Sequence, residues 1–319
     1  MRLKLIAAFA LLIWPLPGFL LAASRENTAT LGGDYVGSET CVACHAEQQK
    51  SFDRTIMGNA MAHSKSGIEA RGCESCHGPG KAHVQAGGGK DTIPVRFAKG
   101  TSTPVEEQNA ACISCHSKGN QMFWRGSAHE SRVMACVDCH QVHYGSPVAR
   151  QAALTEKTRY GAPLNETAGI RKSQPEICLT CHQVRRAQLE RSSHMPYREG
   201  KVTCTSCHNP HGSPNPSQLI QSSINENCYS CHAERRGPFL WEHPPVMENC
   251  DNCHDPHGSS NPQLLKVRMP RVCDSCHVSS RHPTQAQTLS SIKTFNRSCT
   301  NCHSLIHGSN HPSGDMFIR

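Results

Sequence analysis

Hydrophobic and polar residues follow no sustained helical or strand period along most of this chain. Beyond residue 23 the short apolar groups are separated by Gly, Pro and Ser, and the mean hydropathy of the chain is −0.51. Frequent Gly and Pro favour turns and coil, and alternation of apolar with polar residues is too weak to indicate strands. The pattern predicts mostly coil with short α-helices and little or no β-sheet.

The one long apolar run lies at the beginning of the chain, at residues 6–21. Arg2 and Lys4 precede it, Pro15 and Pro17 interrupt it, and small residues follow it. These features indicate a secretory signal peptide at residues 1–23, removed on export to the periplasm. A retained membrane anchor is the alternative, but the run is short and broken by prolines. No other stretch is apolar enough to span a membrane as a helix, and residues 24–40, which are polar, are expected to form a flexible lead-in.

One pentad, Cys-x-x-Cys-His, occurs ten times and uses all 20 cysteines. At this composition, histidine would follow ten Cys pairs by chance with a probability of roughly 10⁻¹². Zinc ribbons and disulfide lattices do not require that histidine. Covalent attachment of haem c does, because the thiols form thioether bonds and the histidine binds the iron. The expected haem-bearing cysteines are Cys41, Cys44, Cys73, Cys76, Cys112, Cys115, Cys136, Cys139, Cys178, Cys181, Cys204, Cys207, Cys228, Cys231, Cys250, Cys253, Cys273, Cys276, Cys299 and Cys302. The expected proximal iron ligands are His45, His77, His116, His140, His182, His208, His232, His254, His277 and His303.

The motifs fall into pairs, and each pair carries two further histidines. This periodicity predicts one decahaem domain at residues 41–319, built from five two-haem units at 41–83, 112–143, 178–211, 228–257 and 273–311. The longer links at 84–111 and 144–177 are expected to be surface loops, with excursions that pack on haem as the alternative. The predicted distal iron ligands are His63, His83, His129, His143, His194, His211, His243, His257, His282 and His307.

The histidine count favours two imidazoles on every iron. Of 21 histidines, ten belong to the motifs and ten to the repeated distal positions, which leaves His311 as a surface residue or as a replacement for His307. His208 and His211 are three residues apart, and an extended chain of that length spans only about 10 Å. The chain cannot carry His211 around a porphyrin edge, so these two histidines should bind different haems.

Composition and charge change the picture in two ways. Aromatic residues make up only 5% of the chain, so we expect ten porphyrins to supply the apolar core and the apoprotein to be largely unfolded. The formal charge is +8 with the signal peptide and +6 without Arg2 and Lys4. Ten bis-histidine haems would bring it to about −4 when oxidised and about −14 when reduced, which disfavours a nucleic-acid partner.

Iron with two axial imidazoles has no open position for a substrate, and such haems change oxidation state with little rearrangement. Ten of them in a short chain must lie close together, and electron tunnelling falls exponentially with distance. The sequence therefore predicts electron transport along a series of haems, with no catalytic residues and no enzyme activity.

The chain resembles the MtrA/DmsE-type decahaem c-type cytochromes of outer-membrane porin–cytochrome electron conduits. The resemblance covers essentially the whole mature chain and rests on the ten motifs, the opening Tyr35-Val36-Gly37-Ser38-Glu39-Thr40-Cys41, the stretch Cys73-Glu74-Ser75-Cys76-His77-Gly78-Pro79-Gly80 and the repeated His-Gly-Ser. It implies an elongated haem wire inside an outer-membrane β-barrel porin, on the periplasmic side and in the interior of that membrane. The implied donors are periplasmic or inner-membrane cytochromes. The implied acceptors are an extracellular multihaem cytochrome, a terminal reductase or external acceptors, and some relatives run in the reverse direction.

Two other functions remain open at this stage. A soluble periplasmic electron shuttle would need the same haems. A multihaem oxidoreductase of the nitrite or hydroxylamine type would need at least one five-coordinate iron, often with a lysine-containing motif or a missing histidine. The sequence contains neither departure from the ten repeated motifs.

Overall fold

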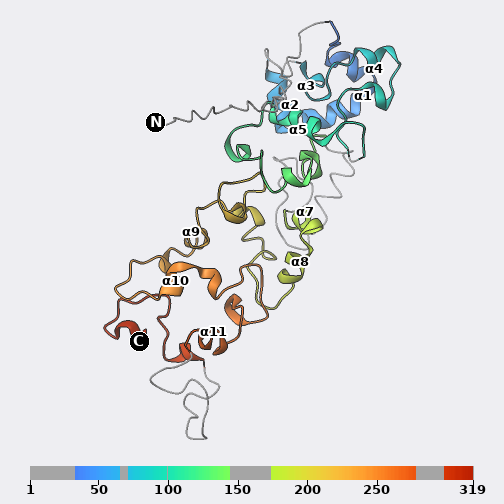
Figure 1. Cartoon of the computed structure of the whole chain (residues 1–319). Helices are drawn as coiled ribbons and strands as arrows, with labels where there is room; N and C mark the ends of the chain where they lie inside the picture. Colours follow the sequence, from blue (N-terminus) through green and yellow to red (C-terminus); the bar gives the residue numbers. More distant parts are fainter. Residues whose placement is uncertain (1–32, 65–70, 99, 144–173, 278–297, 319) are drawn as a thin grey trace, which may run out of the picture. The chain divides into compact units, whose positions relative to one another are not determined.

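A computed structural model describes residues 33–64, 71–98, 100–143, 174–277 and 298–318. The chain divides into two units, Met1–Gly33 and Asp34–Arg319, and the following description concerns the second. The expected signal peptide at residues 1–23 lies outside the described residues, as does most of the lead-in. Figure 1 shows short helices joined by long irregular connections from α1 onward.

The helices are short, as the pattern of the sequence predicts. The α-helices are α1 (Ser38–Asp53), α2 (Ile56–His63), α3 (Glu74–His77), α4 (Lys81–Gln85), α5 (Val105–Ile113), α7 (Gln174–Cys181), α8 (Gln183–Leu189), α9 (Ile224–Tyr229), α10 (Pro244–Glu248) and α11 (Arg271–Asp274). The 3-10 helices are η2 (Lys90–Thr92), η3 (Gly119–Gln121), η4 (Glu130–Arg132), η5 (Cys136–Asp138), η7 (Cys204–Ser206), η8 (Pro216–Gln218), η9 (Ala233–Arg235), η10 (Cys250–Asn252), η11 (Pro262–Leu264), η13 (Cys299–Asn301) and η14 (Gly314–Met316).

No β-strand occurs among the described residues, and pairing of extended backbone is limited to isolated antiparallel bridges. The expected fold class, mostly coil with short helices and little or no sheet, is confirmed. Within the same residues, no helix is long and apolar enough to cross a bilayer.

The two motifs of a unit have different local structure. The first motif begins in an α-helix in every unit, in α1, α5, α7, α9 and α11. The second begins with a 3-10 turn in the last four units, at η5, η7, η10 and η13, whereas in the first unit it lies at α3. This alternation gives the repeat a period of two motifs.

Side chains form only a small core of their own. The buried apolar cluster consists of Leu179, Leu189 and Tyr197, with Met195 and Val202 packed against it. Such a cluster is small for a chain of this length, because about 300 residues ordinarily bury a substantial apolar interior. The polypeptide therefore needs another source of apolar surface.

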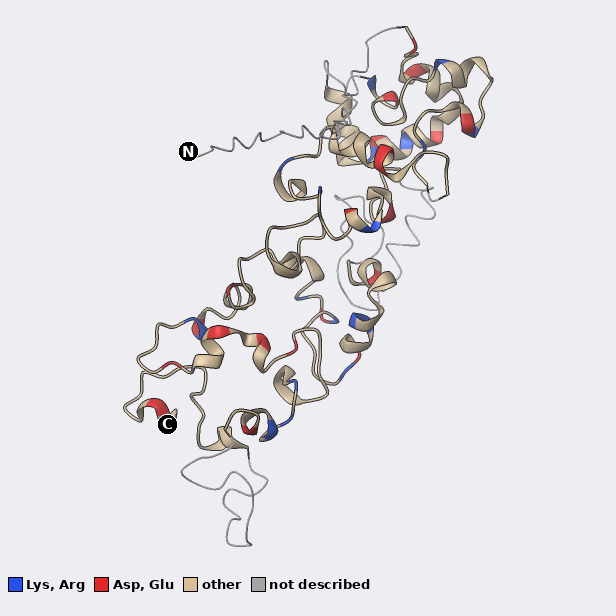
Figure 2. Cartoon of the chain, viewed as in Figure 1, with Lys and Arg blue, Asp and Glu red and all other residues tan. Residues whose placement is uncertain are grey.

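Acidic and basic residues are interspersed along the described chain (Figure 2). Several of them pair locally, as Arg236 does with both carboxylate oxygens of Glu226 at 2.8 and 2.9 Å and Lys266 with Asp251 at 3.0 Å. Exposed pairs of this kind contribute little to stability.

Candidate haem-binding sites

Each Cys-x-x-Cys-His motif forms a single helical turn. In nine motifs the histidine N–H donates to the carbonyl of the first cysteine at 2.8 to 3.1 Å; His45 lies instead at a kink inside α1. One turn of helix brings residues four apart to the same face. Both thiols and the imidazole are therefore presented together, as attachment to one porphyrin requires.

The first cysteines of the two motifs in a unit lie against each other. Hydrogen bonds between thiols join Cys41 to Cys73, Cys112 to Cys136, Cys178 to Cys204, Cys228 to Cys250 and Cys273 to Cys299. In the second pair this hydrogen bond raises the pKa of Cys112 and lowers the pKa of Cys136, because one thiol donates to the other. The two haem attachment points of each unit are thus adjacent.

Cysteines of consecutive units are also neighbours. Burial is the first cause of the raised pKa of Cys76, Cys207 and Cys253, and the second is a thiol of the following unit, respectively Cys115, Cys231 and Cys276. Cys139 similarly contributes to the raised pKa of Cys178, after Cys204 and burial. The attachment points therefore follow one another in the order of the sequence.

A buried polar side chain holds the two motifs of a unit together. Asn225, three residues before Cys228, accepts from the backbone N–H of Cys250 at 2.7 Å and donates to the carbonyls of Val246 and Met247, both at 3.0 Å. The residue three before the first cysteine does the same in two other units: Asn109 accepts from Cys136 N at 2.8 Å, and Ser38 accepts from Cys73 N at 3.0 Å. Sequence reasoning missed this motif clasp, although the shared spacing from the cysteine could have shown it.

The histidine rings meet in pairs at a distance that suits an iron atom between them. Two metal–imidazole bonds of about 2 Å, with about 1.1 Å from each nitrogen to its ring centre, place the two centres about 6.2 Å apart. Seven proximal–distal pairs have ring centres 5.9 to 6.4 Å apart. The pairs are His45–His83, His77–His143, His182–His129, His140–His211, His208–His257, His277–His243 and His254–His307.

Six of these seven pairs join different units. The ring of His211 lies beside His140, and the ring of His208 lies beside His257, so neighbouring histidines on the chain face different partners. Only His45 and His83 belong to the same unit.

The His-Gly-Ser turns seat the third, fourth and fifth units on the units that precede them. Gly258 has φ +133°, and a Cβ there would collide with the carbonyl of Gln188. Ser193 and Ser259 exchange backbone hydrogen bonds of 3.0 and 2.7 Å beside it. The same seating recurs where Gly212 meets Phe123, and where Gly308 meets Phe239 beside the reciprocal pair Trp241 and Ser309. The repeated glycine is thus required by close approach between units.

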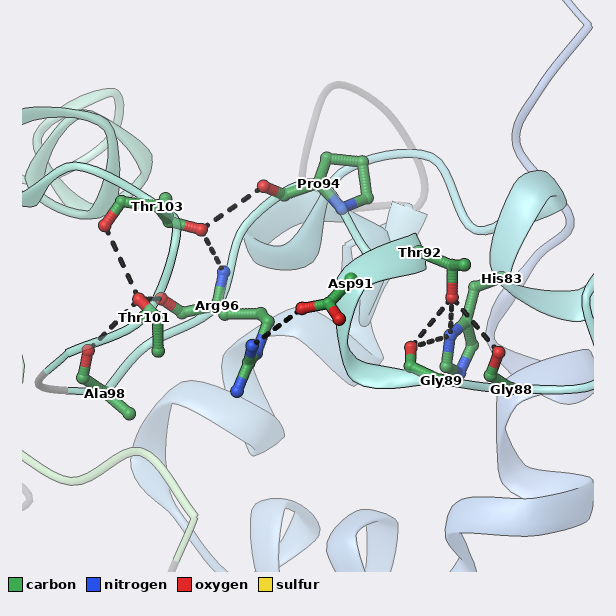
Figure 3. A network of polar contacts seen from close by, with 10 residues as sticks. All are labelled: His83, Gly88, Gly89, Asp91, Thr92, Pro94, Arg96, Ala98, Thr101 and Thr103. Atoms are coloured by element: carbon green, nitrogen blue, oxygen red, sulfur yellow. Dashed lines mark hydrogen bonds and ion pairs between the residues drawn. The ribbon is translucent and has the colours of Figure 1, made fainter.

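Backbone carbonyls orient many of the imidazoles through their Nδ1 atoms. His83 lies 3.0 Å from the carbonyl of Gly89 and 2.9 Å from Thr92 Oγ1, which itself donates to Gly88 and Gly89 (Figure 3). Because Nδ1–H donates to the carbonyl, Nε2 is left free for a metal. Comparable distances of 2.6 to 3.0 Å occur at His63, His77, His129, His194, His208, His254 and His303.

Part of the long link at 84–111 also serves the histidines. The carbonyl of Val95 lies 3.0 Å from His77 Nδ1, and the Gly89 carbonyl and Thr92 hold His83. Around them, Thr103 Oγ1 accepts from Arg96 N at 3.0 Å and donates to the Pro94 carbonyl at 3.4 Å (Figure 3). Of the two expectations for this link, the excursion that packs on the haem region fits these contacts.

Burial keeps several of these imidazoles neutral. It lowers the pKa of His307 to about 4, with further lowering by Arg235, His254 and His243 and an opposing effect of Glu234. Burial is also the first cause of the lowered pKa of His77, His182, His211, His243 and His257. A neutral imidazole is the form that binds iron.

The remaining predicted ligands are less closely paired. Within the described residues the rings of His63, His116, His194 and His232 form no pair at this spacing, and His282 lies outside the described residues. His303 directs Nδ1 toward the carbonyl of Met316 at 2.6 Å.

The leftover histidine, His311, occupies a turn position that is asparagine in two other units. The backbone N–H groups of Asn215, Asn261 and His311 all donate to the serine of the preceding His-Gly-Ser, at 2.9 to 3.0 Å. His311 is exposed, and its Nδ1 accepts from Ser313 N at 3.2 Å. His307, not His311, is the residue whose ring lies beside another imidazole.

The sequence matches three family models, two of which are described as cytochromes. The doubled CXXCH motif matches residues 194–237 and 243–282, the cytochrome c-type NrfB-like family matches residues 73–162, and the cytochrome c554 and c-prime family matches residues 22–78. The doubled motif pairs Cys204 with Cys228 and Cys250 with Cys273. It therefore groups neighbouring motifs across the unit boundaries expected from the histidines.

Comparison with individual proteins gives a longer match. The chain is 42% identical over 294 residues to the multiheme cytochrome MtrA of Shewanella baltica, covering 89% of this chain and 81% of that protein. It is 27% identical over 149 residues to the cytochrome c-type protein NrfB of Escherichia coli O6:H1, covering 46% of this chain and 65% of the relative. It is 25% identical over 223 residues to the C-type polyheme cytochrome OmcB of Geobacter sulfurreducens, covering 60% of this chain and 28% of the relative.

Proposed function

This chain belongs to the MtrA-type multihaem c-type cytochromes, and from that membership we propose that it carries electrons across the outer membrane inside a β-barrel porin. Covalent binding of haem c and electron transfer are properties of the family. The number of haems, their ligands, the porin and the path across the membrane are the proposal. The observation that carries it is the spacing of 5.9 to 6.4 Å between facing imidazoles, which suits iron closed on both sides.

Ten haems are proposed, one on each Cys-x-x-Cys-His motif, with the motif histidine as the proximal ligand. Bound haem supplies reversible one-electron chemistry. The chain's own residues attach the porphyrin, fix both axial imidazoles and exclude a substrate from the iron. Enzyme activity is therefore not proposed.

The distal histidines follow a rule of exchange between units. The first distal histidine of a unit faces the first motif of the next unit, as His129 faces His182 and His243 faces His277. The second distal histidine faces the second motif of the preceding unit, in the pairs His143–His77, His211–His140, His257–His208 and His307–His254.

The same rule assigns the ligands that form no close ring pair. It pairs His63 with His116 and His194 with His232. In the first unit, His83 faces His45 of the same unit. His282 is then the ligand left for His303.

The order of the attachment points supports conduction in sequence order. The first cysteines of the two motifs in a unit are in contact, and thiols of consecutive units are neighbours. Porphyrins attached at such points must lie close together, and closely spaced haems conduct. Electrons are proposed to enter from periplasmic or inner-membrane cytochromes and to leave to an extracellular multihaem cytochrome, a terminal reductase or an external acceptor, or to flow in reverse.

Reconstitution tests the conduit. The exported holoprotein is purified with and without a co-expressed β-barrel porin from the same organism and inserted into liposomes that enclose reduced methyl viologen. Oxidation of the enclosed dye by external Fe(III) should require both proteins. Recovery only as a free monomer, with no transmembrane oxidation in the presence of the barrel, would instead support a soluble periplasmic shuttle.

Two measurements address the haem sites separately from the membrane. Intact mass should exceed that of the mature polypeptide by ten haems. Reduced protein should bind no carbon monoxide or nitrite, because no iron has an open position; substantial binding would support an oxidoreductase of the nitrite or hydroxylamine type.

A further inference from the structure

Two turns of the repeat have the same backbone and differ in one charge. They are His208-Asn209-Pro210-His211 and His254-Asp255-Pro256-His257. The Asn209 side-chain oxygen accepts from His211 N at 3.1 Å, and the Asp255 carboxylate accepts from His257 N at 3.0 Å. Each turn therefore places an oxygen beside the backbone of a distal histidine, but only Asp255 brings a negative charge.

Asp255 is held against the imidazole of His257. Its Oδ1 lies 3.6 Å from His257 Nδ1, and its Oδ2 accepts from Gln188 Nε2 at 2.7 Å. The side chain of Asp255 is 19% exposed and that of His257 is 26% exposed, so water screens the charge of Asp255 only in part. Asn209 instead donates its amide to the carbonyl of Asn120 at 2.9 Å.

Eight other imidazoles have a neutral backbone carbonyl within 3.0 Å of Nδ1. Glu234 also lies 3.5 Å from Nδ1 of His232, but both side chains are exposed and Glu234 pairs with Arg235 at 3.3 Å. A carboxylate beside a ligating imidazole makes the ring a stronger electron donor and stabilises the higher charge of ferric iron. The opposing charge here is Arg185, whose guanidinium donates to Gln188 Oε1 at 2.6 Å and is exposed. After burial, Arg185 lowers the pKa of His257, while Asp255 raises it.

We propose that Asp255 lowers the reduction potential of the haem bound by His208 and His257, and that Asn209 leaves the haem bound by His140 and His211 without this effect. This inference rests on the ligand pairs of the proposed function. The iron would lie about 8 Å from the carboxylate, where a charge in a partly screened site shifts the ferric–ferrous equilibrium by about tenfold. A tenfold change corresponds to 59 mV for one electron.

The consequence for transport is an uneven series of haems. The haem of His208 and His257 belongs to the sixth motif, in the middle of the chain, and the haem two places before it, on the fourth motif, has the neutral version of the turn beside its distal histidine. A more reducing haem in mid-series holds electrons briefly and directs charge to the haems on either side.

The full-length holoprotein tests this with isosteric exchanges at both turns. Asp255→Asn should raise the midpoint potential of one haem, which corresponds to a change of about tenfold in its ferric–ferrous equilibrium. Asn209→Asp should lower the midpoint potential of another haem by a similar factor in that equilibrium. Arg185→Gln should lower the same midpoint that Asp255→Asn raises. The readout is a potentiometric titration followed by the low-spin electron paramagnetic resonance signals and the haem absorption.

The outcomes separate this proposal from the function on which it rests. Unchanged midpoints in both Asp255→Asn and Asn209→Asp, with ten haems by mass and an intact low-spin spectrum, would overturn the role of Asp255 alone. High-spin iron in the unaltered protein would refute the bis-histidine ligation itself. If Asp255→Asn fails to assemble, Asn209→Asp still decides the matter, because it adds the charge at the equivalent turn.

Discussion

Removal of the Asn225 side chain should loosen the link between the two haem attachment points of the fourth unit. Asn225 is 7% exposed and makes hydrogen bonds of 2.7, 3.0 and 3.0 Å to Cys250, Val246 and Met247. Asn225→Ala leaves one N–H and two carbonyls with fewer partners. At about 1 kcal/mol for each lost bond, with more for a buried group left unsatisfied, the local opening free energy falls by about 2–4 kcal/mol.

Amide hydrogen exchange measures this opening directly. A chain with many covalent cofactors does not unfold in two states, so exchange of a peptide containing Cys250 is more informative than a melting temperature. A loss of 2–4 kcal/mol accelerates exchange of the Cys250 amide by about 30- to 1000-fold. Asn225→Asp keeps the acceptor for Cys250 N and should show a smaller acceleration.

Asn120→Ala is the matched control, because Asn120 is exposed and accepts from Asn209 only through its backbone carbonyl. Its exchange profile should match that of the unaltered protein. If Asn225→Ala also leaves Cys250 protected, the reasoning that the motif clasp holds the two motifs together is wrong.

Three further changes test the junctions and the ligands. Gly258→Ala forces a Cβ against the Gln188 carbonyl at φ +133° and should destabilise the third and fourth units by more than about 1 kcal/mol. Amide hydrogen exchange at Ser193 should become faster. Gly87→Ala is the control, because Gly87 also has positive φ but lies in open space, and it should not affect these units. His63→Ala should create one high-spin haem that binds one carbon monoxide per molecule, whereas His311→Ala should create none. Carbon monoxide binding to His311→Ala would show that His311, and not His307, is an axial ligand. His307 has its pKa lowered to about 4 from an unfolded value near 6.5, so the unfolded state binds more protons as the pH falls. The free energy of unfolding should therefore be constant above about pH 6.5 and should fall as the pH is lowered from there toward about 4. High-spin absorption should appear in the same pH range or lower. A loss of stability when the pH is raised from 7 would contradict this direction of the pH dependence.

The fold class and the covalent binding of haem c could both be predicted from the sequence, because frequent Gly and Pro favour coil with short helices and the pentads indicate haem attachment. The axial ligands follow from the histidine count and stay a prediction. The separation of His208 and His211 by three residues indicates that each faces a different partner, and their rings lie beside His257 and His140. Local spacing is enough for these conclusions because they depend on chain length alone.

Other features needed the structure because they depend on contacts between distant residues. Asn225 shares with Asn109 and Ser38 the position three residues before a first cysteine, but this spacing does not identify its partner Cys250, which is 25 residues away. Gly258 was visible as part of a repeat, but the collision that requires glycine involves Gln188, which lies in the preceding unit. His311 could not be separated from His307 by spacing, since only the ring contact with His254 distinguishes them.

The reciprocal placement of distal histidines limits how such an array can change in length. A two-haem unit inserted between two existing units receives one distal histidine from each neighbour and supplies one to each. Under the proposed exchange, duplication of a whole unit therefore leaves every iron with two imidazoles. Under the same proposed exchange, excision of a whole internal unit is the reverse change, because its two neighbours then supply each other's ligands. A cut within the series instead leaves an unmatched imidazole and an unmatched iron in the unit before the cut. The array can therefore gain or lose two haems at a time from within, whereas loss of a single motif would leave an unmatched imidazole in one adjoining unit.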